Sequence, residues 1–99
     1  MKLGILGGGQ LARMMALKSY AIGIEPHVLC AKLTDPAAQV TPFAMQGKTT
    51  SQKDLKKFLK KVDLAIFENE FLDIPTLKQA ATDTKTPIHP KPQIMMINF

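Results

Sequence analysis

Apolar residues along this chain occur either in short continuous runs or three to four positions apart. The alternation of these two patterns predicts where strands and helices lie. Short apolar runs predict three buried strands, at 3–6, 26–30 and 64–67. Between the strands, apolar residues lie three or four positions apart, which is the spacing of a helix face. The clearest helical stripe consists of Leu55, Phe58, Leu59 and Val62.

Polar, glycine and proline residues mark where the helices begin and end. Ser51 with Asp54 three positions later has the form of a capping box, and Asp73 is placed to cap the next helix. Asp35 followed by Pro36 predicts the start of a short helix, and Gly23 a helix end. Weaker signals predict strands at 42–45 and 86–89 and a last helix from 92 onward.

The resulting order of elements alternates strands with helices. Strands separated by helices favour a parallel sheet that is covered on both faces. The expected fold is therefore α/β, with a small open parallel sheet and helices on both faces. A length of 99 residues suits a single domain over 1–99.

The charge of the chain is basic, with 13 Lys and Arg against 8 Asp and Glu, a formal net charge of +5. Lys56, Lys57, Lys60 and Lys61 carry much of it in one stretch, which predicts a solvated helix face. Because Arg13 is the only arginine and aromatic residues make up 6%, we expect no nucleic-acid partner. Apolar runs are far shorter than the roughly 20 residues of a membrane span. The single Cys30 suits a reducing compartment, and we expect a cytoplasmic protein.

A glycine turn between the first strand and the first helix carries the candidate chemistry. Gly7, Gly9 and Ala12 fit the G-x-G-x-x-G/A pattern, in which backbone N–H groups at a helix start approach a phosphate. An NAD site also needs an acidic residue at the end of the second strand, and none is present before Asp35. Three alternatives stay open here: a stand-alone nucleotide- or phosphate-binding Rossmann module, a truncated NADP-dependent oxidoreductase domain that uses Lys32, and glycines that serve packing alone.

Three segments of the chain together resemble a known family. They read GILGGGQLARMMA at 4–16, DPAAQV at 35–40 and DLAIFENEF at 63–71. In this order they resemble the N-terminal, Rossmann-like pre-ATP-grasp domain of 5-(carboxyamino)imidazole ribonucleotide synthase, the ATPase subunit of phosphoribosylaminoimidazole carboxylase. The resemblance implies an ATP-grasp ligase of purine biosynthesis. Such an enzyme carboxylates aminoimidazole ribonucleotide with ATP and bicarbonate.

The same resemblance implies which residues meet the substrate. It assigns substrate binding to Gly8, Gly9, Gln10 and Leu11, at the 5′-phosphate end, and to Glu68 and Glu70 after the third buried strand. It assigns no catalytic residue and no metal ligand to this chain. Alternatively, Glu68 and Glu70 are solvated loop carboxylates.

The resemblance covers only the first domain of that family. It implies ATP-grasp domains beyond this chain, which carry the ATP and magnesium sites, so that we expect this domain alone to bind no cofactor and to be inactive. The expected partners are aminoimidazole ribonucleotide and those missing domains. The parent enzyme is expected to be a homodimer.

Overall fold

The computed structural model describes residues 1–67 and 73–89. Strands and helices alternate along these residues, as the spacing of apolar positions predicts. The elements are β1 (Lys2–Leu6), α1 (Gln10–Ala21), β2 (Glu25–Cys30), the 3-10 helix η1 (Pro36–Gln39), β3 (Ala44–Gln46), α2 (Gln52–Leu59), β4 (Leu64–Phe67), α3 (Ile74–Thr84) and β5 (Ile88–His89). The helix expected from 92 onward lies outside the described residues.

The strands form one parallel sheet in the order β3-β2-β1-β4-β5. The central strand β1 pairs with β2 on one side and with β4 on the other, so that Ile5 lies opposite both Val28 and Ile66. This is the strand order of a Rossmann-type sheet, in which the direction of winding reverses beside the first strand. The predicted fold class is confirmed.

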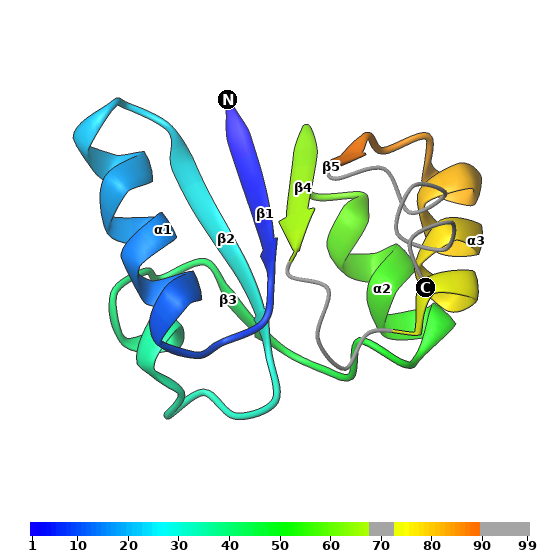
Figure 1. Ribbon diagram of the computed structural model, residues 1–99, viewed down its shortest axis with the longest axis horizontal. Helices are drawn as coiled ribbons and strands as arrows, with labels where there is room; N and C mark the ends of the chain where they lie inside the picture. The colour runs from blue at the N-terminus through cyan, green and yellow to red at the C-terminus, as the bar shows by residue number, and fades with distance from the viewer. Residues whose placement is uncertain (68–72, 90–99) are drawn as a thin grey trace.

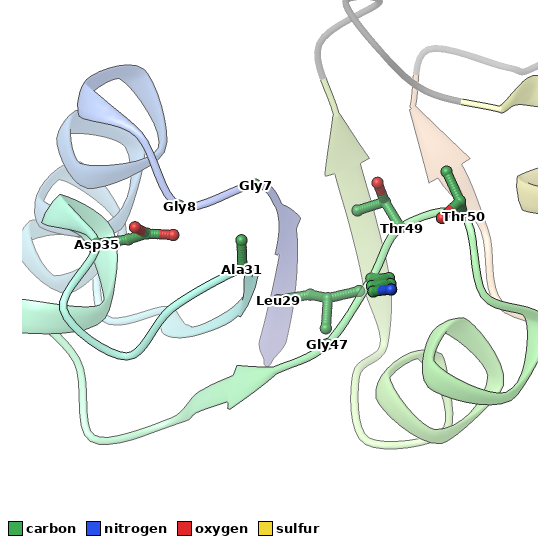
Figure 2. Close-up of a pocket in the computed structure, with 9 residues that line it drawn as sticks. Gly7, Gly8, Leu29, Ala31, Asp35, Gly47, Thr49 and Thr50 are labelled. Atoms are coloured by element: carbon green, nitrogen blue, oxygen red, sulfur yellow. The ribbon is translucent and has the colours of Figure 1, made fainter.

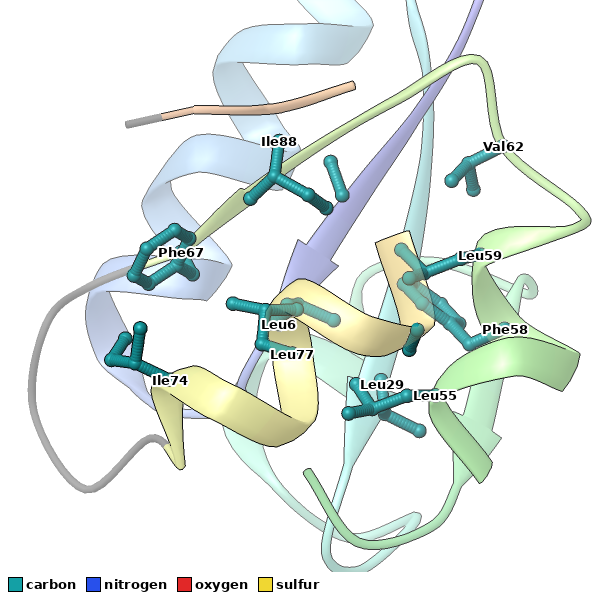
Figure 3. Close-up of a cluster of buried hydrophobic side chains, with 12 residues drawn as sticks. Leu6, Leu29, Leu55, Phe58, Leu59, Val62, Phe67, Ile74, Leu77 and Ile88 are labelled. Carbon is teal, nitrogen blue, oxygen red and sulfur yellow. The ribbon is translucent and has the colours of Figure 1, made fainter. Parts of the chain in front are cut away.

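Helices cover both faces of the sheet (Figure 1). Alternation along β1 sends Ile5 to one face and Leu6 to the other, and each belongs to a separate hydrophobic cluster. Ile5 packs with α1 and η1, whereas Leu6 packs with α2 and α3. Figure 3 shows the larger of the two clusters, which contains Leu6. In it, Leu55 and Phe58 of α2 pack with Leu77 of α3 against the sheet.

The predicted helix ends are largely confirmed by local hydrogen bonds. The Asp54 N–H donates to Ser51 Oγ over 3.2 Å at the start of α2, and the Thr76 N–H donates to Asp73 Oδ1 over 3.2 Å at the start of α3. After α1, Gly23 has a φ of +77°, a conformation that glycine adopts at no steric cost. These ends fix where each helix leaves the sheet.

The lysines of α2 and of the turn that follows it form the solvated face that the sequence predicts. Lys57, Lys60 and Lys61 are exposed, while Lys56 pairs with Asp83 of α3 over 2.8 Å. The hydrogen bond from Lys56 lowers the pKa of the Asp83 carboxyl below its ordinary value. Across the described ranges, none of the helices combines the length and the apolar character needed to cross a membrane.

Replacing Leu55 with alanine tests the packing between α2 and the sheet. Leu55 is fully buried in the larger cluster, so Leu55→Ala should lower the free energy of unfolding by about 2–5 kcal/mol. Urea denaturation followed by circular dichroism measures this loss. Lys57→Ala, on the exposed face of the same helix, should change it by less than about 0.5 kcal/mol. Equal losses for the two variants would contradict the described packing.

Candidate functional site

The glycine turn after β1 leads directly into α1. Gly7 has a φ of +127°, which favours glycine, and its N–H donates to the Leu29 carbonyl over 2.9 Å. Gly9 is the N-cap of α1, where no side chain accepts from the first turn and no acidic residue lies in it. The first N–H groups of α1 therefore keep their partial positive charge without a side-chain cap, at least from the residues that the structure describes.

Gly8 lies in close contact with the segment that follows β2. A Cβ atom at this position would lie 2.7 Å from Cys30 Cβ and 2.9 Å from Asp35 Cβ, closer than real side chains approach. The Gly8 carbonyl accepts a hydrogen bond of 2.9 Å from the Ala37 N–H. The absence of a side chain thus lets the turn and η1 pack directly against each other.

Asp35 differs from its predicted role as a helix cap. It occupies the N-cap position before Pro36, but its side chain makes no cap hydrogen bond. Instead Asp35 Oδ2 accepts from the Lys32 N–H over 3.1 Å, while the Asp35 N–H donates to the Lys32 carbonyl over 3.0 Å. This turn holds the Asp35 carboxylate beside Gly8, close to the end of β2. The fold therefore brings a carboxylate to the strand end, although no acidic residue lies there in the sequence.

A pocket of about 330 Å³ opens beside this turn. Its lining residues are Gly7, Gly8, Leu29, Ala31, Asp35, Gly47, Lys48, Thr49 and Thr50. Figure 2 shows Asp35 on one side of the pocket and Thr49 and Thr50 on the opposite side. These residues follow or end β1, β2 and β3, and ligands of open α/β sheets bind at the carboxyl ends of the strands.

The loop from β3 to α2 is a part of the pocket that the sequence analysis missed. It reads Gly-Lys-Thr-Thr-Ser at 47–51. The Gly47 N–H donates to the Cys30 carbonyl over 2.9 Å, and the Lys48 N–H donates to Asp54 Oδ2 over 2.9 Å. A G-K-T sequence between a strand and a helix was the available signal, although the phosphate-binding P-loop also requires a glycine where this chain has Pro42.

The predicted substrate-binding residues are only partly brought together. Gly8 lines the pocket, whereas Gly9, Gln10 and Leu11 are exposed at the start of α1 and are not among the lining residues. The other two predicted residues, Glu68 and Glu70, lie outside the described residues. Their assignment stays a prediction.

Cys30 is 1% exposed beneath the glycine turn, as expected for a small buried hydrophobic residue. Burial, and to a lesser degree the charge of Asp35, raises the pKa of its thiol. The thiol therefore stays protonated at neutral pH and is a poor nucleophile. In the two described stretches, no three His, Cys, Asp or Glu side chains form a group that can hold a metal ion.

Comparison with known proteins identifies the family. The sequence profile of the ribonucleotide synthetase preATP-grasp domain matches residues 1–98. The chain belongs to the ribonucleotide synthetase preATP-grasp family. The family predicted from the segments at 4–16, 35–40 and 63–71 is confirmed.

Relatives of this preATP-grasp domain are much longer proteins. The N5-carboxyaminoimidazole ribonucleotide synthase of Mycobacterium tuberculosis is 33% identical over 94 residues, which cover 95% of this chain and 22% of the relative. The crystal structure of N5-carboxyaminoimidazole ribonucleotide synthetase from Thermotoga maritima superposes with a TM-score of 0.87 at 31% identity, covering 97% of this chain and 26% of that one. The chain thus spans about a quarter of the length of these relatives or less.

A third relative is a ligand complex. The N5-carboxyaminoimidazole synthase of Aspergillus clavatus was solved with ADP and 5-aminoimidazole ribonucleotide, and it is similar with a TM-score of 0.84 at 29% identity. The similarity covers 96% of this chain and 25% of that one. These three relatives are ribonucleotide synthases, which favours the preATP-grasp interpretation over an NADP-dependent oxidoreductase or a stand-alone Rossmann module.

Adding one methyl group at Gly8 tests the close contact beneath the turn. Gly8→Ala should lower the free energy of unfolding by about 1–3 kcal/mol, because the Cβ atoms of Cys30 and Asp35 are held by backbone and cannot move aside freely. Gly9→Ala is the matched control, since a Cβ there meets no atom within 4 Å. Chemical denaturation compares them, and a larger loss for Gly9→Ala would contradict the described geometry.

The reactivity of Cys30 tests its environment. The native thiol should react with an aromatic disulfide reagent at least about 100-fold more slowly than in denaturant, because it is both buried and protonated at neutral pH. Absorbance of the released thiolate gives the rate. Reaction at the rate of the unfolded chain would show that the turn does not cover Cys30.

Proposed function

We propose that this chain is the N-terminal, ribonucleotide-binding domain of an ATP-grasp ligase that carboxylates aminoimidazole ribonucleotide with ATP and bicarbonate in purine biosynthesis. The observation that carries the proposal is the position of the uncapped start of α1, beside a pocket at the carboxyl ends of β1, β2 and β3. The family to which the chain belongs, and relatives named as ribonucleotide synthases, support this substrate class.

The binding role is assigned to the glycine turn and the first turn of α1. Gly9 leaves the backbone open to close approach, since a Cβ there would meet no atom within 4 Å, and the Gln10 side chain is exposed next to the free N–H groups. A phosphate monoester suits such a helix start because the anion meets partial positive charge. Leu11, which is 48% exposed, offers an apolar contact beside it.

The remaining chemistry is proposed to lie in the rest of a longer protein. The single-domain interpretation of 1–99 implies ATP-grasp domains in the parent enzyme, and relatives solved with ADP support nucleotide use there. The ATP and magnesium sites are assigned to those further domains, since no three His, Cys, Asp or Glu side chains of the described residues form a group that could hold a metal ion. The parent enzyme is correspondingly proposed to be a homodimer in the cytoplasm and to require magnesium.

Calorimetric titration of the 99-residue chain with aminoimidazole ribonucleotide tests the binding role. We expect weak binding, because many contacts belong to the missing domains, and no heat on titration with ATP. Gln10→Ala should weaken binding of the ribonucleotide about tenfold, the usual effect of losing one hydrogen bond to a charged group. Gln79→Ala, an exposed glutamine on α3, is the matched control.

Three results would overturn this assignment. Micromolar binding of NADPH would return the oxidoreductase interpretation to first place. Unchanged binding of the ribonucleotide by Gln10→Ala would remove Gln10 from the site. Bicarbonate-dependent ATP turnover by the 99-residue chain would show that the chain is more than a binding domain.

A further inference from the structure

A second pocket, of about 260 Å³, lies beside the edge strand β3. Its lining comes from β2, from the start of β3, and from α2 with the turn that follows it. Pro42 and Phe43 lie before β3 and Lys61 lies after α2, whereas the loop at 47–50, which lines the pocket beside the glycine turn, joins the other ends of these two elements. The two pockets share none of their described lining residues, and the proposed ribonucleotide site leaves the second one unused.

A stacked pair of rings forms one wall of this second pocket. The ring centroids of His27 and Phe43 lie 4.7 Å apart, with the ring planes inclined by 22°. The His27 Nε2–H donates to Glu25 Oε2 over 2.6 Å, and this hydrogen bond holds the imidazole plane in place. Phe43 is 40% exposed, so part of its ring surface remains open to a ligand. A flat ligand ring can therefore extend a stack that the protein already holds in position.

Most of the remaining lining is apolar and favours an apolar ligand body. Pro42, Ala44, Met45 and Phe58 bring no side-chain N–H or O–H group to the pocket. Phe58 is 1% exposed, so its ring is a fixed part of the lining. A volume of about 260 Å³ lies just below the usual range for ligand pockets, which suits a single ring and excludes a nucleotide.

Lys61 gives the second pocket a positive charge. Its side chain takes part in neither of the two ion pairs found among the described residues. None of the described lining residues is acidic, and the nearby Glu25 carboxylate already accepts from His27. The Lys61 N–H donates to the Phe58 carbonyl over 3.0 Å, which holds the backbone that carries the ammonium group. An ammonium group at an apolar pocket without a carboxylate favours an anionic ligand.

We propose that this second pocket binds a small aromatic carboxylate, with the ring stacked on Phe43 and the carboxylate at Lys61. His27 acts as a positioning residue, because its contact with Glu25 holds the ring against which Phe43 lies. The inference does not rest on the proposed function, since the ribonucleotide site lies at the other end of β3. A ligand in the second pocket leaves the pocket beside the glycine turn open.

Nuclear magnetic resonance titration of the 99-residue chain with benzoate in low-salt buffer tests this site. For so small a ligand we expect a dissociation constant on the order of 1 mM. Chemical shift changes should centre on the amides of 43–45 and 61. Benzamide, which has nearly the same shape without the charge, should bind about fivefold more weakly. Cyclohexanecarboxylate, which keeps the charge without the aromatic ring, should bind about threefold more weakly.

Two variants separate the charge from the stacking. Lys61→Met should weaken benzoate about fivefold and leave benzamide within about twofold, because only benzoate is charged. Phe43→Leu should remove the preference for benzoate over cyclohexanecarboxylate. Both residues are exposed, so both variants should fold normally. Lys57→Met is the matched control, since it removes the same charge from an exposed position of α2 that does not line the pocket.

Several outcomes would overturn the inference. One is the absence of a saturable shift at 43–45 and 61 with benzoate up to about 20 mM. Others are equal binding of benzamide and benzoate, equal losses for Lys57→Met and Lys61→Met, or an unchanged ring preference in Phe43→Leu. Shifts centred on the glycine turn, or displacement of aminoimidazole ribonucleotide by benzoate, would place the carboxylate at the first pocket instead. Failure of the ribonucleotide to bind would leave the benzoate results unchanged and would bear on the proposed function alone.

Discussion

At Gly8 the backbone of the β1–α1 turn lies directly against Cys30 and Asp35, and the arrangement around the pocket depends on this contact. A single methyl group at Gly8 would come within 2.7 Å of Cys30 Cβ. Because no side chain separates them, η1 binds the turn through the Ala37 N–H, and Asp35 is held beside the start of α1. The glycine thus acts on the structure first, and its proposed effect on ligand binding depends on the groups that it allows to lie nearby.

Three connections that follow parallel strands form the pocket, and each supplies a different kind of group. The turn after β1 supplies exposed backbone, the segment after β2 supplies a carboxylate, and the loop after β3 supplies an ammonium group with two hydroxyls. Parallel pairing brings these connections to one edge of the sheet, since all carboxyl ends of the strands point the same way. A rigid scaffold with polar loops at one edge is the common design of small-molecule sites.

The chain is much shorter than its relatives, and we therefore propose that substrate binding and nucleotide chemistry lie in different domains of a longer protein. This chain, about a quarter of the length of a ribonucleotide synthetase, is proposed to provide a substrate-binding surface, and the nucleotide chemistry is proposed to lie in the rest of a longer protein. The described pocket matches that role because it is small and polar at both ends. The buried, protonated thiol of Cys30 serves packing beneath the turn, and the proposed role of this domain is recognition by hydrogen bonds and charge.

The amino-acid sequence by itself determined the order of strands and helices, the glycine turn and most helix ends, because apolar spacing and caps such as Ser51 and Asp73 act over a few residues. It suggested a helix cap at Asp35 and gave no role to Lys48. Only the tertiary structure decided that the Asp35 carboxylate turns back to Lys32 beside Gly8, and that 47–50 lines the same pocket. These contacts join residues about 27 to 40 positions apart through the strand order β3-β2-β1, which local spacing does not encode.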